Sequence, residues 1–255
     1  QTASLAFGGT PPVTAATESY NGTSWTEVND LNTARSALAG AGTSTSALAF
    51  GGSAPPQVTN NESFNGTSWT EVANLNTARD ALGGVGTNTA ALAFGGNPPV
   101  TGITELWNGS SWTEVADLTT AREWIAGAGT NTAALGFGGT TGSYTANTEL
   151  WNGSSWSEVN NLNVAKGYMA GAGTSTSALG FGGFSPPIGN TAQTEEWNGT
   201  SFTEVGDLST GRYGLGGSGS ASSALAFGGY DGSATAVTEE WTGAGAPVTE
   251  TITTS

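Results

Sequence analysis

All basic residues of this chain occupy one position of an internal repeat. The 255 residues include five Lys or Arg side chains, and each follows a short segment such as Asp-Leu-Asn-Thr-Ala or Asn-Leu-Asn-Thr-Ala. A period of about 44 residues indicates copies of one supersecondary unit, which must stack on its neighbours to bury its apolar face. Residues shared by all copies therefore indicate the architecture, and residues that differ between copies are the candidates for a specific function. The five basic residues are Arg35, Arg79, Arg122, Lys166 and Arg212.

Each copy also contains an apolar segment that ends in Phe-Gly-Gly. The chain has 41 glycines and no sustained apolar period of 3.6 residues, which disfavours helices. Short segments bounded by Gly, Pro, Asn and Ser instead predict strands and turns. Asn-Gly separates the third and fourth segments and is typical of a type I′ hairpin, with positive φ at both central residues. The Phe-Gly-Gly segments contain Phe7, Phe50, Phe94, Phe137, Phe181 and Phe227.

Four antiparallel strands in about 44 residues are the size of one β-propeller blade. Residues 47–50 are apolar on both faces, as expected for a strand packed between two neighbouring blades, and residues 39–42 are small enough to lie beside a central axis. We predict an all-β protein in which residues 1–255 form one β-propeller of four-stranded antiparallel blades. The large aromatic residues of the third and fourth segments fill the wider outer part: Tyr20, Phe64, Trp107, Trp151, Trp197 and Trp241, then Trp25, Trp69, Trp112, Trp156 and Phe202.

The repeat resembles that of the kelch family. That family's pattern has an apolar strand ending in Gly-Gly, a later aromatic residue, a tryptophan and an Arg that opens the next first strand; here these are Gly51-Gly52, Phe64, Trp69 and Arg79. The resemblance covers nearly the whole chain and implies a kelch-like propeller that serves as a binding platform. The copies are more alike, and the loops shorter, than in typical members. Copper radical oxidases of this fold need His and Cys ligands, which this sequence lacks.

Counting the segments shows that one strand is missing from a closed ring. The second and third segments occur six times, but the first occurs only five times, beginning near residues 35, 79, 122, 166 and 212. The sixth copy of the fourth segment falls in a degenerate tail, residues 247–255. We predict six blades, with an inner strand absent from the blade at the amino terminus. Five blades, with redundant strands at both ends, are the alternative.

The missing strand has two interpretations, because unpaired strand edges recruit other strands. In one, the blade closes with three strands or the strand lies outside these 255 residues. In the other, a neighbouring molecule donates a strand and builds an oligomer or filament by β-augmentation. The threonine-rich segment 248–255 has the β-favouring composition of such a donor.

The charge and the residue content exclude several partners and chemistries. Five basic and 20 acidic residues give a net charge of −15, which disfavours nucleic acids and anionic membranes as partners. With no cysteine and no histidine, disulfides, thiolate chemistry and imidazole metal sites are excluded, and no cofactor or metal is expected. No apolar run reaches the roughly 20 residues of a spanning helix, so no membrane insertion is expected. No leader of basic and apolar residues opens the printed sequence.

The repeated basic residue has two interpretations. It forms a ring of cations for an acidic ligand, or it pairs with a repeated glutamate. The abundance of acidic residues favours the pair, which contributes only about 0–1 kcal/mol if it is exposed. The candidate partners are Glu18, Glu62, Glu105, Glu149, Glu195 and Glu239 in the third segments and Glu27, Glu71, Glu114, Glu158 and Glu204 in the fourth.

Three further motifs are explained by structure rather than by chemistry. The Asn-Gly-Thr/Ser sequences match glycosylation sequons, but the turn accounts for the same residues. Gly-Gly reads as a bend, because no helix follows it to build a phosphate site. Glu195-Glu196 and Glu239-Glu240 are adjacent in strands, so their side chains point to opposite faces and form no ready pair of catalytic carboxylates.

The copies differ mainly in two loops, which lie on the same face of the predicted ring. After the basic residue come Ser36, Asp80, Glu123-Trp124, Gly167-Tyr168 and Tyr213. Aromatic exceptions gather in the later copies, and Tyr and Trp supply much contact area with little loss of entropy. They form a stacking platform for a sugar or a partner side chain, or they fill the channel and the gaps between blades. The candidate binding residues are Trp124, Tyr144, Tyr168, Phe184, Tyr213 and Tyr230.

We therefore expect a non-enzymatic propeller at an extracellular, cell or virion surface that binds a protein or glycan ligand through its variable loops. One alternative is a structural subunit that self-associates through its unpaired strand. A second is a carboxylate-dependent glycan hydrolase or lyase, which requires two carboxylates roughly 5–10 Å apart in a cleft.

Overall fold

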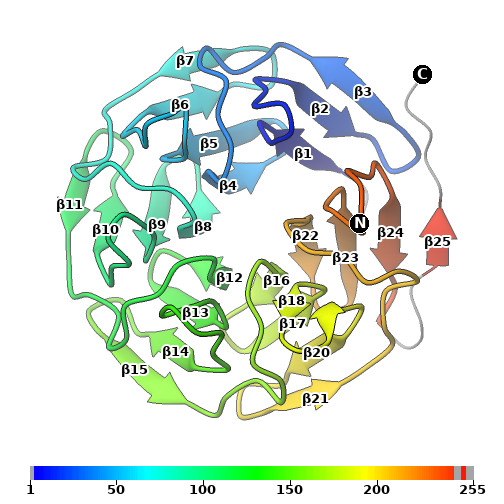
Figure 1. Ribbon diagram of the computed structural model, residues 1–255. Coiled ribbons are helices and arrows are strands. Elements are labelled where there is room, and N and C mark those ends of the chain that lie inside the picture. The colour runs from blue at the N-terminus through cyan, green and yellow to red at the C-terminus, as the bar shows by residue number, and fades with distance from the viewer. Residues whose placement is uncertain (1–2, 244–247, 251–255) are drawn as a thin grey trace.

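The structure is a computed structural model that describes residues 3–243 and 248–250. Six antiparallel sheets of three or four strands stand around a central axis, so the protein is an all-β, six-bladed β-propeller (Figure 1). No helix occurs in the described ranges. The predicted fold class is confirmed, and the five-bladed alternative is wrong.

The blades follow one another along the chain, and in blades two to six the first strand of the repeat is innermost. The first blade has three strands: β1 (Ser4–Phe7), β2 (Thr17–Tyr20) and β3 (Trp25–Val28). The second comprises β4 (Ala39–Thr43), β5 (Ser46–Phe50), β6 (Asn61–Phe64) and β7 (Trp69–Glu71). The third comprises β8 (Gly83–Thr87), β9 (Ala90–Phe94), β10 (Thr104–Trp107) and β11 (Trp112–Glu114).

The other three blades repeat this order with one added hairpin. The fourth comprises β12 (Ala126–Thr130), β13 (Ala133–Phe137), β14 (Thr148–Trp151) and β15 (Trp156–Val159). The fifth comprises β16 (Ala170–Thr174), β17 (Ser177–Phe181), β20 (Thr194–Trp197) and β21 (Phe202–Glu204), with the hairpin β18 (Phe184–Ser185) and β19 (Gly189–Asn190). The sixth comprises β22 (Gly216–Ser220), β23 (Ser223–Phe227), β24 (Thr238–Trp241) and β25 (Val248–Glu250).

The two irregular blades, the first and the sixth, have the strands that the sequence predicts. The first blade lacks an inner strand, whereas β25 completes the sixth blade by pairing with β24. Residues 248–250 of the predicted tail therefore form a fourth strand, and the rest of residues 247–255 lie outside the described part of the chain. Figure 1 shows β1 beside β22 at the place where the inner ring is interrupted.

Small inner strands allow the blades to meet closely at the axis. In the second blade β4 pairs with β5 so that Ala39 faces Phe50. A Cβ atom on Gly84 of the next inner strand would lie 2.7 Å from the ring of Phe50, so only glycine fits there. The second strand is buried on both sides, and Leu48 and Phe50 are 0% exposed. Burial of one such side chain contributes about 1.5–3 kcal/mol.

An outer tryptophan joins each of the first four blades to the preceding one, and Phe202 does so in the fifth. Trp69 packs edge-on against Phe7 of the first blade at a ring distance of 5.1 Å, and its indole N–H donates to Thr17 Oγ1 at 3.1 Å. The same arrangement closes the ring, because Trp25 lies 5.0 Å from Phe227 and donates to Thr238 Oγ1. These contacts place the predicted large aromatics in the wider outer part of each blade interface.

The Asn-Gly hairpins form, but not with the predicted type I′ geometry. Gly22 has a φ of +96°, whereas Asn21 is not among the residues with positive φ. The Asn21 side chain instead accepts hydrogen bonds from the backbone N–H groups of Thr23 and Ser24, each at 2.9 Å. The asparagine thus acts as the acceptor of an Asx turn in a four-residue loop. That role explains its repetition as well as positive φ would.

Candidate functional site

The repeated basic residues are buried inside the blades. Each pairs with the glutamate on the third strand of its own blade, and the charged side chains are at most 2% exposed. A ring of cations open to an acidic ligand is therefore wrong. The pairs and their N–O distances are Arg35–Glu62 at 2.9 Å, Arg79–Glu105 at 2.6 Å, Arg122–Glu149 at 2.8 Å, Lys166–Glu195 at 3.2 Å and Arg212–Glu239 at 3.0 Å.

Each arginine fastens the entry to an inner strand. Arg35 donates to the carbonyls of Gly51 and Asn60, both at 2.8 Å, as well as to Glu62. The other oxygen of Glu62 accepts from the backbone N–H of Asn32 at 2.7 Å. Burial lowers the pKa of Arg35, and the neighbouring Glu62 carboxylate opposes that shift. The paired residues therefore belong to the scaffold, and Glu195 is committed to Lys166 rather than to a dyad with Glu196.

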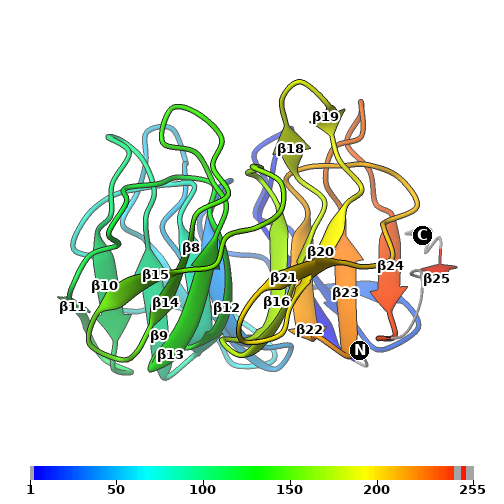
Figure 2. The ribbon, with the colours of Figure 1, turned by 90° about the horizontal axis from the view of Figure 1, so that it is seen from below.

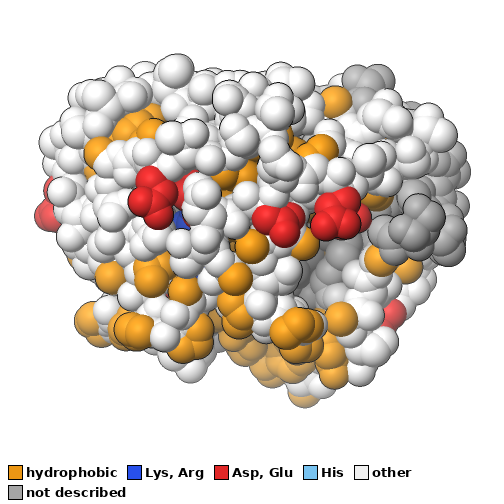
Figure 3. All heavy atoms as spheres, turned by 90° about the horizontal axis from the view of Figure 1, so that it is seen from above, with side chains coloured by type: hydrophobic (Ala, Val, Ile, Leu, Met, Phe, Trp, Pro, Cys, Tyr) orange, Lys and Arg blue, Asp and Glu red, His pale blue; other side chains and the backbone are white. Residues whose placement is uncertain are grey.

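The variable loops lie together on one face of the ring. In the side view of Figure 2 the loops between second and third strands rise above the blades, with the β18–β19 hairpin among the tallest. Hydrophobic side chains gather along the edge that carries these loops, and acidic side chains lie in a band at mid-height (Figure 3). We call this side the loop face.

The six candidate binding residues form one connected group of rings on the loop face of blades four to six, here called the aromatic cluster. Trp124 stacks on Tyr168 with 4.2 Å between centroids and 22° between planes. Tyr168 and Phe184 both contact Tyr213, at 5.7 and 5.9 Å. Further contacts extend the group: Tyr144 with Phe184 at 5.6 Å, Tyr144 with Tyr168 at 6.4 Å, and Tyr213 with Tyr230 at 5.4 Å.

The rings of the aromatic cluster are packed on one side and open on the other. Five are half-buried, and Tyr230 is 37% exposed. This state lies between the two sequence interpretations, because the rings pack on each other and still present surface. Partly exposed aromatic rings held by their neighbours are suited to stacking on a ligand.

An unusual backbone places the two stacked rings. Trp124 and Tyr168 have φ values of +52° and +57°, a region that non-glycine residues seldom occupy. Trp124 N–H donates to the carbonyl of Ala81 at 2.7 Å, and Tyr168 N–H donates to that of Trp124 at 3.2 Å. These bonds belong to a chain that links equivalent residues of successive blades, here called the backbone ring: Ala37, Ala81, Trp124, Tyr168 and Gly214. The backbone ring was not evident in the sequence, because alanine occupies two of its positions.

Carboxylates lie at one end of the aromatic cluster. Burial, together with the nearby Asp80, raises the pKa of Glu123. Burial raises the pKa of Tyr168 to about 12, with further contributions from Tyr144 and Glu123. The Tyr168 hydroxyl is therefore protonated at neutral pH and able to donate. In the sequence, only its position directly before Trp124 indicated that Glu123 lies beside the aromatic cluster.

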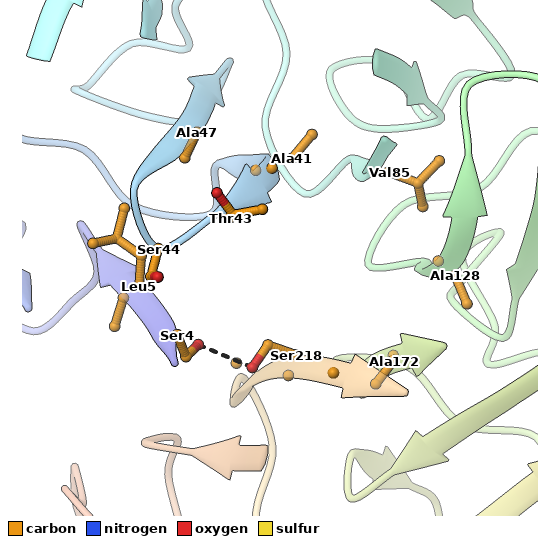
Figure 4. Close-up of a pocket in the computed structure, with 18 of the residues that line it drawn as sticks. Ser4, Leu5, Ala41, Thr43, Ser44, Ala47, Val85, Ala128, Ala172 and Ser218 are labelled. Carbon is orange, nitrogen blue, oxygen red and sulfur yellow. Dashed lines mark hydrogen bonds between the residues drawn. The ribbon is translucent and has the colours of Figure 1, made fainter. Parts of the chain in front are cut away.

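A cavity of about 680 Å³ occupies the centre of the ring beside β1 (Figure 4). Its described lining consists largely of glycine and alanine from the inner strands, together with residues 3–7 and Phe227, and includes no charged side chain. At one side of the cavity Ser4 Oγ and Ser218 Oγ are hydrogen-bonded at 2.9 Å. Such a lining supplies shape and backbone groups rather than acid–base chemistry.

The described residues show no metal site, and the sequence matches no family model or curated protein. The described residues contain no group of three His, Cys, Asp or Glu side chains that could hold a metal ion. None of their elements is a helix long and apolar enough to cross a membrane. Comparison with protein-family models and with curated proteins finds no significant match to this chain. The class of protein is therefore defined by the fold, a six-bladed β-propeller.

Proposed function

We propose that this protein is a kelch-like, non-enzymatic binding module that takes a glycan on the aromatic cluster. A protein side chain that bears a ring is the alternative ligand. An extracellular, cell-surface or virion-surface setting belongs to the same proposal, because the chain is acidic and free of cysteine. The observation that carries the proposal is the gathering of six rings from three blades into one partly exposed surface.

The chemistry of the aromatic cluster favours a neutral carbohydrate. Stacked Trp124 and Tyr168 offer flat faces to the C–H side of a sugar ring. Protonated tyrosine hydroxyls donate to sugar oxygens, and Glu123 accepts from sugar hydroxyls. A net charge of −15 works against polyanionic glycans, because like charges repel.

The test is a glycan array followed by calorimetric titration with the best ligand. Trp124→Ala should weaken binding by about 2 kcal/mol, which is about 30-fold, with the melting temperature largely unchanged. Val13→Ala is the matched control, because Val13 is 37% exposed in a loop on the same face but in the first blade. A collapse of stability in Trp124→Ala would instead assign the ring to packing.

The three-stranded first blade supports a second candidate, a structural subunit that self-associates by strand exchange. An unpaired strand edge is a template for another strand. Native mass spectrometry tests this candidate: oligomers that depend on concentration support it, and a monomer at all concentrations opposes it.

The hydrolase or lyase alternative has one point of support on the loop face. Asp80 is close enough to Glu123 to raise the pKa of its carboxyl group, and paired carboxylates are what such chemistry needs. An activity screen that compares the native chain with Glu123→Gln tests it, since turnover lost in the variant would favour an enzyme.

A further inference from the structure

Among the described residues, one edge of β1 has no pairing strand and faces an open strand position. β1 pairs with β2 on one side, with Ser4 opposite Tyr20 and Phe7 opposite Thr17. In the other five blades the second strand also pairs with an inner strand, whereas β1 borders the 680 Å³ cavity. The consequence is visible in burial, because Leu5 and Phe7 are half-buried while Leu48 and Phe50 are 0% exposed.

Glu18 is the carboxylate left over from the repeated ion pairs. It lies opposite Ala6 of β1, as Glu62 lies opposite Ala49 of β5. The five equivalent glutamates are buried against Arg or Lys. Glu18 is half-buried, and no basic residue of the described ranges pairs with it. The missing inner strand is therefore also the place of a missing cation.

The backbone around the position is incomplete in the same way. In five blades the second glycine after the Phe donates to the carbonyl of the next blade's basic residue, as Gly52 N–H donates to Arg79 at 2.9 Å. The sixth equivalent, Gly229, makes no such bond within residues 3–243 and 248–250. The backbone ring is interrupted here too, because no described residue links the Gly214 carbonyl to the Ala37 N–H.

The space also specifies the side chains of an occupant. A Cβ on Gly51 would meet the Arg79 carbonyl at 2.8 Å and the Leu82 side chain at 3.2 Å, but on Gly228 it would meet only the Thr235 carbonyl at 3.8 Å. In the equivalent blades, a basic residue's carbonyl and the apolar side chain three residues later fill the space that is open beside Gly228. The ring of Phe227 packs on Gly216 of its own blade and lines the cavity. Its five counterparts each lie against a glycine in the inner strand of the following blade, as Phe50 lies against Gly84.

We infer that this position binds a peptide strand with the sequence pattern of the repeat's own inner segment: Arg-x-x-Leu-small-Gly-small-Gly-Thr. The strand runs antiparallel to β1, with its first small residue opposite Phe7 and its second opposite Leu5, following the register of Ala39 with Phe50 and of Ala41 with Leu48. Its arginine pairs with Glu18. Backbone pairing gives affinity, and the cation and the glycines give specificity.

The occupant is a further segment of this pattern, supplied by neither the described inner strands nor the tail. The five inner segments already pair within their own blades. Residues 248–250 pair with β24, and the sequence of residues 251–255 contains neither glycine nor a basic residue. Ser4 of β1 and Ser218 of β22, the two strands that border the position, are hydrogen-bonded through their hydroxyl groups. The strand position is separate from the aromatic cluster, so the test of peptide binding is independent of glycan binding.

The test uses a fluorescent peptide with the sequence of residues 31–43, titrated into the intact protein and followed by anisotropy. We expect saturable one-to-one binding and, with excess peptide, a higher melting temperature. A peptide of the same composition in scrambled order controls for attraction of a cation to an acidic protein. Replacing Arg35 by Glu in the peptide should weaken binding at least about tenfold, and replacing Gly40 by Val should abolish it.

Protein variants locate the peptide. Glu18→Gln should weaken peptide binding about tenfold. It should also remove most of the affinity difference between the Arg35 and Arg35→Glu peptides, because this double-mutant cycle isolates the pair of Glu18 with the peptide arginine. Glu27→Gln is the matched control, since Glu27 is exposed and lies opposite Glu18 on β3, and it should bind within about twofold of the native chain. Amide exchange at Gly229 should slow when the peptide binds.

Two results would overturn the inference. One is equal binding of the scrambled and native-order peptides. The other is self-association of the protein without peptide that protects Gly229, because a second copy would then fill the position.

Discussion

The first and second blades have closely similar sequences and differ by one strand. Ser4–Phe7 of the first matches Ser46–Phe50 of the second, and both blades carry a glutamate on the next strand. In the second blade that glutamate, Glu62, is buried and paired, whereas Glu18 is not. An inner strand of small residues therefore buries little of its own side-chain surface, but it converts its neighbour from an edge into core.

Removing the same carboxylate from the two blades gives the largest expected contrast. Glu62→Ala leaves Arg35 buried without its partner and should lower the free energy of unfolding by about 3–5 kcal/mol. Glu18→Ala should change the free energy of unfolding by no more than about 0.5 kcal/mol, since it leaves no buried charge without a partner. Urea unfolding of both variants measures the difference. Equal losses would show that Glu18 already has a structural partner.

Truncating the equivalent leucines tests the packing side of the comparison. Leu48→Ala should cost about 3 kcal/mol, because the side chain is 0% exposed and the substitution leaves a cavity. Leu5→Ala should cost about 1 kcal/mol, since the half-buried site borders open space and loses mainly transfer free energy. Thermal unfolding of the two variants ranks them. A larger loss for Leu5 would contradict an open inner edge.

The single lysine at the repeated position shows what the arginine fork adds. Lys166 donates to the carbonyl of Gln193 at 3.2 Å and pairs with Glu195, while Arg35 donates to three carbonyls as well as to Glu62. Lys166→Arg should therefore stabilise the protein by about 1 kcal/mol, the contribution of an added hydrogen bond. A loss of stability would mean that the fifth blade cannot hold the larger head group.

The same substitution gives the smallest expected effect, a change in pH dependence. Burial lowers the pKa of Lys166 below its ordinary value of 10.5. Between the lowered value and 10.5 the unfolded chain binds more protons than the folded one, so this residue makes stability rise with pH in that window. The difference in stability between the native chain and Lys166→Arg, measured by urea unfolding across alkaline pH, should show the rise. A flat difference would mean that folding does not shift this pKa.

The periodic features were predictable because they depend on local sequence. The all-β fold, the six blades and the strand missing from the first blade all followed from counting segments, as did the tail strand at Val248–Glu250. The turn type was predicted wrongly at Asn21, where the side chain accepts backbone hydrogen bonds instead of adopting positive φ. Dipeptide preference fixes where a turn occurs more surely than its geometry, because a side chain competes for the same N–H groups.

The partners of the side chains were decided by tertiary structure. Arg35 had candidate glutamates in both outer strands of its blade, and only the folded blade shows that it is Glu62, with both charges out of water. The aromatic cluster likewise joins residues as far apart in the chain as Trp124 and Tyr230, through contacts across three blades. Sequence by itself determined the repeating unit and its count, because hydrophobic pattern and turn residues act over a few positions. Burial, charge pairing and the gathering of rings depend on neighbouring blades, whose distance and orientation no single repeat encodes.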